Sequence, residues 1–386
     1  MFAMKTRLVV ITEIIAPYRI PVFNALAQEP GIDLHVIFLS ETDPGLRDWH
    51  IYLDEIAFSY EVLPSWRRRL GAHNVLLNQG LRAALNHASP DVVVCGGYNY
   101  LASWQAMAWA RRSHTPFLLW IESTLQDQRS GKIPVEFLKK KFVEGCDGFI
   151  VPGTSSREYV RGFGVPDENI STAPNAVANE VFSARASAAV AQPWLYRKVH
   201  GLPSRFLLFV GRLVPEKGVR DLVQAYEALC EPLRAQLSLV IVGDGPLRQE
   251  IETRAARLVT GRINVAGFVQ RDDLAAYYGL AEMFVFPTRT DPWGLVVNEA
   301  MACGLPVIAS SAAGCVSDLV RNEWNGCVVC PGDVGELGAA ITRLAHDPEL
   351  RRAMGNRSLE LISRHSPMNC AAGIAAATLN CAVATA

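Results

Sequence analysis

The stretch from Phe284 to Ser310 constrains the fold of this chain more than any other part of it. An apolar run at 283–287 precedes a polar loop, a helical pattern that begins near Gly294, and a second apolar run at 306–309. Two buried strands joined through a helix form a βαβ unit, and the strands of such a unit lie parallel. The stretch therefore predicts an α/β fold built on a parallel sheet.

Two carboxylates in this stretch, Asp291 and Glu299, are separated by seven residues. Asp291 falls on the loop, and Glu299 falls on the helix about two turns in, at ~1.5 Å per residue. Between them, the helix start offers the unpaired backbone N–H groups of Gly294, Leu295 and Val296, and the helix dipole favours an anion there. An anion site flanked by two hydroxyl-binding carboxylates suits a nucleotide sugar. An ordinary βαβ unit with two solvated acids is the alternative.

Length and composition restrict the class of protein. The chain has 386 residues, enough for two or three domains of roughly 150 residues each. Its formal net charge of −1 argues against electrostatic binding of nucleic acid. Nine cysteines are scattered along the chain, and the Cys327–Cys330 pair lacks a second CxxC or a histidine pair that would complete a zinc site. We therefore expect core thiols in a reducing compartment.

The sequence carries no clear targeting or membrane-spanning segment. The first apolar run is broken by Glu13, Pro17 and Arg19, which does not fit the uninterrupted apolar core of a secretory signal. The longest uncharged stretch, 92–110, contains a glycine pair and polar residues, unlike a transmembrane span of ~20 apolar residues. We expect a cytoplasmic protein, and peripheral contact with the inner membrane face stays open.

Apolar runs of strand length alternate with helical patterns along almost the whole chain, which indicates parallel sheets wrapped by helices. The alternation pauses at a segment rich in alanine and serine, so we expect a linker at 183–200 between two α/β domains, 1–182 and 201–365. The last residues, 366–386, are expected to form an alanine-rich helix. Strands are predicted at 8–12, 34–39, 58–63, 91–95, 117–121, 148–151, 170–173, 206–210, 237–242, 263–266, 283–287 and 306–309.

Two clusters of basic and apolar residues occur in the first half. The segment 66–70 combines Trp66, three arginines and a leucine, and a helix is predicted directly after it at 74–87. Such a mixture suits anionic lipid headgroups, at ~1 kcal/mol per cation. It equally suits the solvated start of a helix, and both interpretations stay open. A short helix predicted at 135–144 carries three consecutive lysines.

The first strand of the second domain ends in a loop, 211–218, with the sequence GRLVPEKG. Gly211 permits a close approach, and Arg212 and Lys217 place two cations at the carboxyl end of a strand, where open α/β sheets bind ligands. An arginine fork and a lysine that converge on one position suit a diphosphate leaving group. Taken alone, this pair of cations also fits a solvated loop.

Two further loops follow the next strands of the same sheet. VGDGP at 242–246 places Gly243 in a tight turn, and the loop after the following strand places Gly267, Phe268 and Val269 where backbone groups can contact a base. Because the carboxyl ends of parallel strands share one edge of the sheet, these loops and the Asp291–Glu299 unit are predicted to line one rim.

These motifs resemble those of the retaining glycosyltransferases of family 4. The resemblance is carried by GRLVPEKG at 211–218, VGDGP at 242–246, the glycine–phenylalanine pair at 267–268 and DPWGLVVNEAMACGLPVIAS at 291–310, with weaker similarity at 153–177. It implies the GT-B fold of two facing Rossmann-like domains with an inter-domain cleft. The first domain would bind the acceptor and the second the nucleotide sugar, with the C-terminal helix packed back on the first.

The resemblance also implies roles for individual residues. Arg212 and Lys217 would hold the donor pyrophosphate, Asp291 the transferred sugar and Glu299 the ribose hydroxyls. Amides at 294–296 would contact phosphate and sugar, and the 267–269 segment the base. The candidate catalytic residues are thus Arg212, Lys217, Asp291 and Glu122. The candidate acceptor-side residues are Tyr18, Tyr98, Asn99 and Glu122.

The sequence departs from the family pattern at four places. Asp291 stands where a glutamate is usual, and Glu122 stands where many members have a histidine. The loop after the first strand reads Ile-Ala-Pro-Tyr at 15–18 in place of a glycine-rich turn, and 175–178 reads Asn-Ala-Val-Ala in place of Asn-Gly-Val-Asp. We expect the sugar and acceptor contacts to be altered at these positions.

We hypothesise that the chain transfers a sugar, with retention, from a nucleotide-diphosphate sugar to a glycan, lipid-linked or small-molecule acceptor. A UDP-sugar is favoured over a GDP-sugar as donor. No Asp-x-Asp pair occurs, so no metal or other cofactor is expected. A sugar-nucleotide epimerase of the same fold and a non-catalytic nucleotide-sugar-binding protein are the alternatives. A nicotinamide oxidoreductase is disfavoured because Gly-x-Gly-x-x-Gly is absent after both domain-opening strands.

Overall fold

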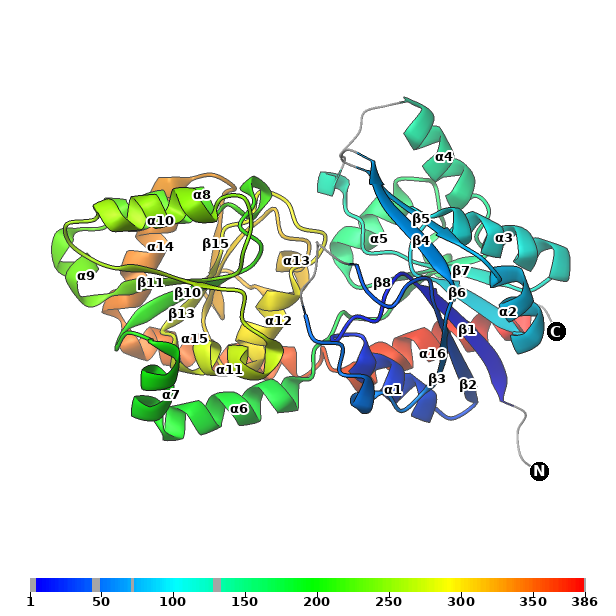
Figure 1. Cartoon of the computed structure of the whole chain (residues 1–386), viewed down its shortest axis with the longest axis horizontal. Helices are drawn as coiled ribbons and strands as arrows, with labels where there is room; N and C mark the ends of the chain where they lie inside the picture. The colour runs from blue at the N-terminus through cyan, green and yellow to red at the C-terminus, as the bar shows by residue number, and fades with distance from the viewer. Residues whose placement is uncertain (1–4, 44–48, 71–72, 128–132, 385–386) are drawn as a thin grey trace. The chain divides into compact units, whose positions relative to one another are not determined.

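The computed structural model describes residues 5–43, 49–70, 73–127 and 133–384. Its contacts divide the chain into two compact units, and each unit contains a parallel sheet with helices on both faces (Figure 1). Unit 1 comprises Met1–Ala176 and Pro367–Ala386, and unit 2 comprises Val177–Ser366. The predicted α/β class is confirmed, and each predicted strand is present with its ends displaced by at most two residues.

The sheet of unit 1 has the strand order β3-β2-β1-β6-β7-β8-β9. The chain moves outward from β1 to β3, crosses back to β6 beside β1, and moves outward again to β9. The carboxyl ends of β1 and β6 therefore lie at a topological switch point, where sheets of this kind bind ligands. The strands are β1 (Thr6–Thr12), β2 (Ile32–Phe38), β3 (Ser59–Val62), β6 (Val92–Cys95), β7 (Phe117–Trp120), β8 (Gly148–Val151) and β9 (Ile170–Thr172).

Both faces of this sheet are buried because alternate residues of each strand point to opposite sides. Leu8 and Val10 of β1 belong to the core beneath α1 and α16, whereas Val9 and Ile11 belong to the core beneath α2, α3 and α4. The helices of unit 1 are α1 (Ile20–Gln28), α2 (Leu81–Ala88), α3 (Leu101–Ser113), α4 (Ile133–Val143), α5 (Thr154–Arg161) and α16 (Pro367–Ala384), with short 3-10 turns η1 (Leu53–Glu55), η2 (Leu125–Asp127) and η3 (Asp167–Asn169).

The sheet of unit 2 has the order β12-β11-β10-β13-β14-β15 and repeats the same reversal. Here the switch point lies between β10 and β13, so the loops that follow these two strands are neighbours. The strands are β10 (Phe206–Val210), β11 (Ser238–Val242), β12 (Ile263–Gly267), β13 (Met283–Phe286), β14 (Val307–Ser310) and β15 (Gly326–Val329).

Helices cover both faces of the second sheet as well, with α8, α10 and α14 on one side and α6, α11 and α12 on the other (Figure 1). Side-chain caps start two of them, because Asp333 accepts from the Glu336 N–H at 2.8 Å and Asp347 from the Leu350 N–H at 2.8 Å. The helices are α6 (Asn179–Ala191), α7 (Pro193–His200), α8 (Val219–Ala228), α9 (Glu231–Gln236), α10 (Arg248–Arg257), α11 (Arg271–Leu280), α12 (Leu295–Ala302), α13 (Val316–Leu319), α14 (Val334–His346) and α15 (Pro348–Ile362), with the 3-10 turn η4 (Pro215–Lys217).

The linker predicted at 183–200 is wrong, because α6 and α7 occupy this segment and belong to unit 2. The contact division falls at 176–177, six residues before the predicted end of the first domain at 182. Alanine has the highest helix propensity, and small side chains let α6 lie close to α11. A Cβ on Gly279 of α11 would stand 2.9 Å from the Ala186 Cα of α6.

The helix predicted at 74–87 is also wrong in its first half. An antiparallel hairpin forms there from β4 (Ser65–Leu70) and β5 (His73–Asn78), and α2 follows. The helix cannot begin earlier because its N-cap residue, Gly80, has the left-handed φ of 84°. The interpretation of 66–70 as a helix start is therefore wrong, since this segment is a strand; residues 71 and 72 lie outside the described part of the chain.

The C-terminal helix α16 packs in unit 1 although it follows unit 2 in the sequence. It contacts α1, β8 and β9, as Figure 1 shows for the red helix beside α1. Gly373 permits this contact, since a Cβ there would stand 2.4 Å from the Thr172 carbonyl oxygen and 2.8 Å from the Ala173 Cα. Residues 385 and 386 of the predicted helix lie outside the described residues.

Replacement of Gly373 by alanine should therefore destabilise unit 1, by about 1–3 kcal/mol, because the added methyl overpacks the contact between α16 and β9. Thermal unfolding monitored by circular dichroism measures the effect. Gly338→Ala on α14 is the matched control, since its Cβ would have 3.8 Å to the nearest atom and alanine favours helix. An unchanged midpoint for Gly373→Ala would contradict this packing.

Candidate functional site

The loops that follow β10 and β13 are joined by hydrogen bonds at the switch point of unit 2. The Glu216 carbonyl oxygen accepts from the Thr288 hydroxyl at 2.9 Å and from the Arg289 N–H at 2.8 Å. Gly218 has a left-handed φ of 66°, and a Cβ there would stand 1.9 Å from the Pro287 carbonyl oxygen. Glycine is therefore required at 218, and the two loops lie in direct contact.

This contact brings together the predicted cation and acid. Lys217 forms an ion pair with Asp291, and both side chains are largely buried. The Asp291 carboxylate also accepts a hydrogen bond from the Trp293 N–H at 3.1 Å. The backbone carbonyl of Asp291 accepts one from the Gly314 N–H at 2.9 Å. Backbone hydrogen bonds therefore hold Asp291 at its carboxylate and at its carbonyl. The ammonium group of Lys217 can leave Asp291 and pair with a bound anion instead.

Arg212 lies at the start of the same loop and is exposed. In the described parts of the chain, its guanidinium forms no ion pair and no hydrogen bond to another side chain. The structure therefore does not bring Arg212 into the Lys217–Asp291 pair, and its positive charge remains available to a ligand at the rim.

The N-terminus of α12 follows directly after the Asp291 loop. Gly294 is its N-cap with a left-handed φ of 99°, and a Cβ there would stand 2.7 Å from a ring carbon of Phe286. The N–H groups of Leu295 and Val296 belong to the first turn, which has no preceding helical carbonyl to accept them. Both residues are partly exposed, so this turn can donate to an anion.

Glu299 lies one turn further along α12 and is partly buried. Its Oε2 accepts from the hydroxyl of the fully buried Tyr278 at 2.8 Å. Burial raises the pKa of Glu299 to about 7, and the Tyr278 hydrogen bond and the charge of Arg271 offset part of that rise. Neither Tyr278 nor Arg271 stood out in the sequence, because a tyrosine on the preceding helix follows no spacing rule.

The glycines predicted at the rim connect the ends of β10, β11 and β12. The Gly243 N–H donates to the Gly267 carbonyl at 2.7 Å, and a Cβ on Gly243, where φ is 136°, would stand 1.9 Å from the Gly211 carbonyl oxygen. Phe268 is 47% exposed and Val269 is partly exposed. These loops therefore form one continuous edge, with an accessible aromatic ring beside it.

Glu122 stands at the carboxyl end of β7 in unit 1, and a cation that the sequence analysis missed holds it. The Arg19 Nη2 donates to the Glu122 Oε1 at 2.6 Å, and the guanidinium carbon lies 3.7 Å from the Trp120 ring centroid. The Ser156 hydroxyl donates to the Glu122 carbonyl at 3.0 Å. Glu122 is therefore oriented by the protein rather than free in solvent.

The other acceptor-side candidates lie on loops at the same edge of the first sheet. The Tyr18 ring centroid lies 6.1 Å from that of Trp49, the Tyr98 hydroxyl lies 3.2 Å from the Tyr159 hydroxyl, and Asn99 is exposed. Among the described residues, no hydrogen bond joins these three candidates to Glu122. The structure places them near the switch point without forming one side-chain cluster.

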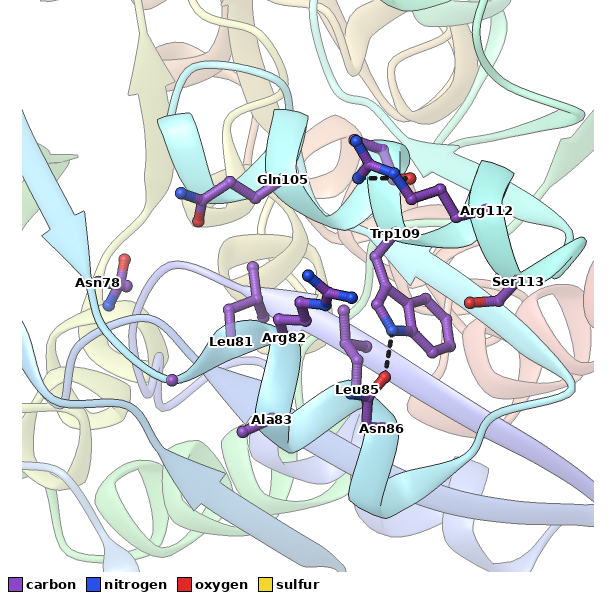
Figure 2. Close-up of a pocket in the computed structure, with 12 residues that line it drawn as sticks. Asn78, Leu81, Arg82, Ala83, Leu85, Asn86, Gln105, Trp109, Arg112 and Ser113 are labelled. Atoms are coloured by element: carbon purple, nitrogen blue, oxygen red, sulfur yellow. Dashed lines mark hydrogen bonds between the residues drawn. The ribbon is translucent and has the colours of Figure 1, made fainter.

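A groove of about 810 Å³ lies between α2 and α3 (Figure 2). Arg82 and Asn86 of α2 and Gln105, Trp109 and Arg112 of α3 contribute to its wall. The Trp109 indole N–H donates to the Asn86 side-chain oxygen at 2.7 Å, which ties the two helices together. None of the predicted site residues lines this groove, so it is separate from the candidate donor site.

Within the ranges that the structure describes, no group of three histidine, cysteine, aspartate or glutamate side chains could hold a metal ion. Within the same ranges, every helix is too short or too polar to cross a bilayer.

The fold and the site define a class of protein: paired Rossmann-like units with a cation, an acid and a helix N-terminus at one sheet edge. The profile "Glycosyl transferases group 1" matches residues 194–360, and the profile "Glycosyltransferase Family 4" matches residues 23–181. The chain belongs to the family 4 glycosyltransferases with the GT-B fold, as its motifs predict.

Curated relatives carry the same family signal. The chain is 34% identical to alpha-D-kanosaminyltransferase of Streptomyces kanamyceticus over 43% of either chain. It is 30% identical to O-antigen chain mannosyltransferase B of Escherichia coli over 61% of this chain and 62% of that protein. The matched part spans about half the length of these relatives.

Solved structures share the fold at low identity. HepE of Anabaena, in complex with UDP and glucose, superposes with a TM-score of 0.74 at 18% identity over 97% of this chain and 99% of that one. Sucrose-phosphate synthase of Thermosynechococcus elongatus superposes with a TM-score of 0.75 at 21% identity over 98% of this chain and 100% of that one.

The raised pKa of Glu299 predicts how stability depends on pH. The unfolded carboxyl ionises near its ordinary pKa of 4.5, whereas the folded one ionises near about 7, so its contribution to stability falls as pH rises between these values. Relative to that of Glu299→Gln, the free energy of unfolding of the native chain should fall by about 2 kcal/mol between pH 5 and pH 8. Urea unfolding of both proteins measures the difference.

The control for this comparison is Glu349→Gln, which removes an exposed carboxylate in the first turn of α15. It makes the same chemical change at an exposed position and so shows what the loss of a carboxylate does by itself. A stability difference between the native chain and Glu299→Gln that stays the same from pH 5 to pH 8 would contradict the raised pKa of Glu299.

Proposed function

We propose that the chain is a retaining glycosyltransferase that moves a hexose from a nucleotide-diphosphate sugar, with a UDP-sugar favoured, to an acceptor hydroxyl. The ion pair between Lys217 and Asp291, placed before the first turn of α12, carries the proposal. A cation and backbone N–H groups suit a diphosphate, and the adjacent carboxylate suits sugar hydroxyls. HepE was crystallised with UDP and glucose, and relatives are named as sugar transferases, which supports this donor class.

In the proposed reaction, the bond between the anomeric carbon and the diphosphate oxygen breaks, and the acceptor oxygen bonds to that carbon from the same face. The departing phosphate oxygen takes the acceptor proton. Lys217, Arg212 and the N–H groups of the first turn of α12 stabilise the negative charge that develops on the leaving group. Asp291 holds the hexose, and Glu299 holds the ribose beside Phe268. The cations take the place of a metal.

The surface of unit 1 supports the acceptor class that we propose. Phe137 and Leu138 of α4 are 59% and 53% exposed, and Lys141 lies 5.7 Å from the Phe137 ring centroid. Trp66, on the hairpin, is 52% exposed. Apolar side chains among cations favour a lipid-linked acceptor at an anionic membrane face over a soluble glycan or a small molecule. Glu122, held by Arg19, would position the acceptor hydroxyl.

Incubation with UDP- and GDP-sugars as donors tests the function. The acceptors offered are soluble saccharides, small molecules, or lipid-linked saccharides in anionic vesicles. We expect sugar transfer to persist after metal ions are removed with EDTA. NMR of the product should show that the transferred sugar keeps the anomeric configuration that it had in the donor. Conversion of the donor without any acceptor would identify an epimerase. Binding without turnover under every condition would identify a nucleotide-sugar-binding protein.

Replacement of Lys217 by alanine should lower kcat/KM about 10²–10³-fold, because it removes charge stabilisation of the leaving group, and Arg212→Ala should act in the same direction. Arg220→Ala is the matched control, since Arg220 pairs with Glu250 on the exposed surface of α8 and α10. Steady-state kinetics and circular dichroism measure activity and folding. Full activity in a folded Lys217→Ala variant would refute the proposed role.

A further inference from the structure

We infer that Tyr278 is a positioning residue that holds the Glu299 carboxylate for the donor ribose and so sets selectivity for a ribonucleotide. The inference rests on the proposed function, because it assigns a second residue to the same donor site. Tyr278 lies on α11, and its hydroxyl donates to the Glu299 Oε2 at 2.8 Å.

The hydrogen bond uses one carboxylate oxygen and leaves the other accessible. Glu299 is partly exposed, and in the described parts of the chain the Oε1 accepts no hydrogen bond from another side chain or N–H group. A carboxylate held at one oxygen presents the second in a fixed direction. This arrangement suits a vicinal diol, because two ribose hydroxyls can share the exposed edge of the carboxylate.

Packing prevents Tyr278 from following Glu299 if the carboxylate moves. The Tyr278 side chain is fully buried, with its ring centroid 5.6 Å from that of Phe284 and 6.3 Å from that of Phe182. Burial and the neighbouring Glu299 charge raise the pKa of Tyr278 well above its ordinary value, so it remains a neutral donor. A rigid donor of this kind selects one rotamer of a glutamate that would otherwise have several.

The charged and titratable groups around Glu299 explain why the hydroxyl matters. From α11, Tyr278 and Arg271 stabilise the ionised carboxylate, whereas burial among α6, α11 and β13 opposes ionisation. Directly after α12, the thiol of Cys303 interacts with the same carboxylate. Loss of the tyrosine hydroxyl would remove the hydrogen bond from Tyr278 to the anion, so Glu299 would be more often protonated and less well oriented at neutral pH.

Tyr278→Phe tests the inference, and Tyr277→Phe is the matched control on the same helix. Tyr277 is also buried, but its ring lies beside His200, 5.3 Å between centroids, rather than beside Glu299. Calorimetric titration with UDP and with 2′,3′-dideoxy-UDP separates ribose recognition from phosphate binding. Donor kinetics separate KM from kcat, and thermal unfolding reports the fold.

We expect the native chain and Tyr277→Phe to bind UDP about tenfold more tightly than the dideoxy analogue. In Tyr278→Phe the ratio of the two dissociation constants should approach one. The KM for the donor should rise, and kcat should stay within about threefold of the native value. An undiminished preference in Tyr278→Phe would overturn the inference and leave the proposed function standing. A native chain that binds no UDP-, GDP- or ADP-sugar would overturn the proposed function together with this inference.

A crystal structure of the native chain with UDP is the second test, and it does not depend on folding of the variant. The inference requires the ribose hydroxyls to contact Glu299 while Tyr278 still donates to the Oε2. A carboxylate turned away from Tyr278, or a ribose bound by other groups, would overturn it.

Discussion

The close contact between the loops after β10 and β13 is the constraint on which the candidate site depends. Gly218 leaves no room for a side chain against the Pro287 carbonyl, and the Glu216 carbonyl accepts hydrogen bonds from Thr288, Arg289 and Thr290 of the opposite loop. The parallel strand order, which reverses at this point, makes the two loops neighbours. The ion pair of Lys217 with Asp291 follows from that contact, although the two residues are far apart in the chain.

The site divides its charges between an exposed and a buried region. Arg212 is exposed to solvent, and the charge of Lys217 is balanced by Asp291. The two cations therefore lower the stability of the folded chain little when no anion is bound. Glu299 is different, because burial disfavours its charge and raises its pKa to about 7. A hydroxyl of a neighbouring helix compensates it in part, which links the packing of α11 against α12 to the chemistry of the donor site.

Local sequence failed where packing decided the structure. The residues at 74–78 have a pattern that also fits a helix, but pairing with β4 and the left-handed Gly80 make them a strand. The alanine-rich segment after Phe182 lacks strong periodicity, yet it forms α6 because its small side chains fit closely against α11. In both cases the structure depends on packing against another element, through strand pairing in the first and through small side chains in the second. Hydrophobic periodicity does not reveal such packing.

The sequence by itself determined the parallel α/β class, the positions of most strands of the two large sheets, and the motif residues at the strand ends, because strand length, glycine spacing and helix start signals are local. It also placed Asp291, Gly294 and Glu299 on one strand–loop–helix unit. Only the tertiary structure decided that Lys217 meets Asp291, that Arg19 holds Glu122, and that Tyr278 holds Glu299. These contacts join residues far apart in the chain, and they exist only once the sheet order and the helix packing bring their elements together.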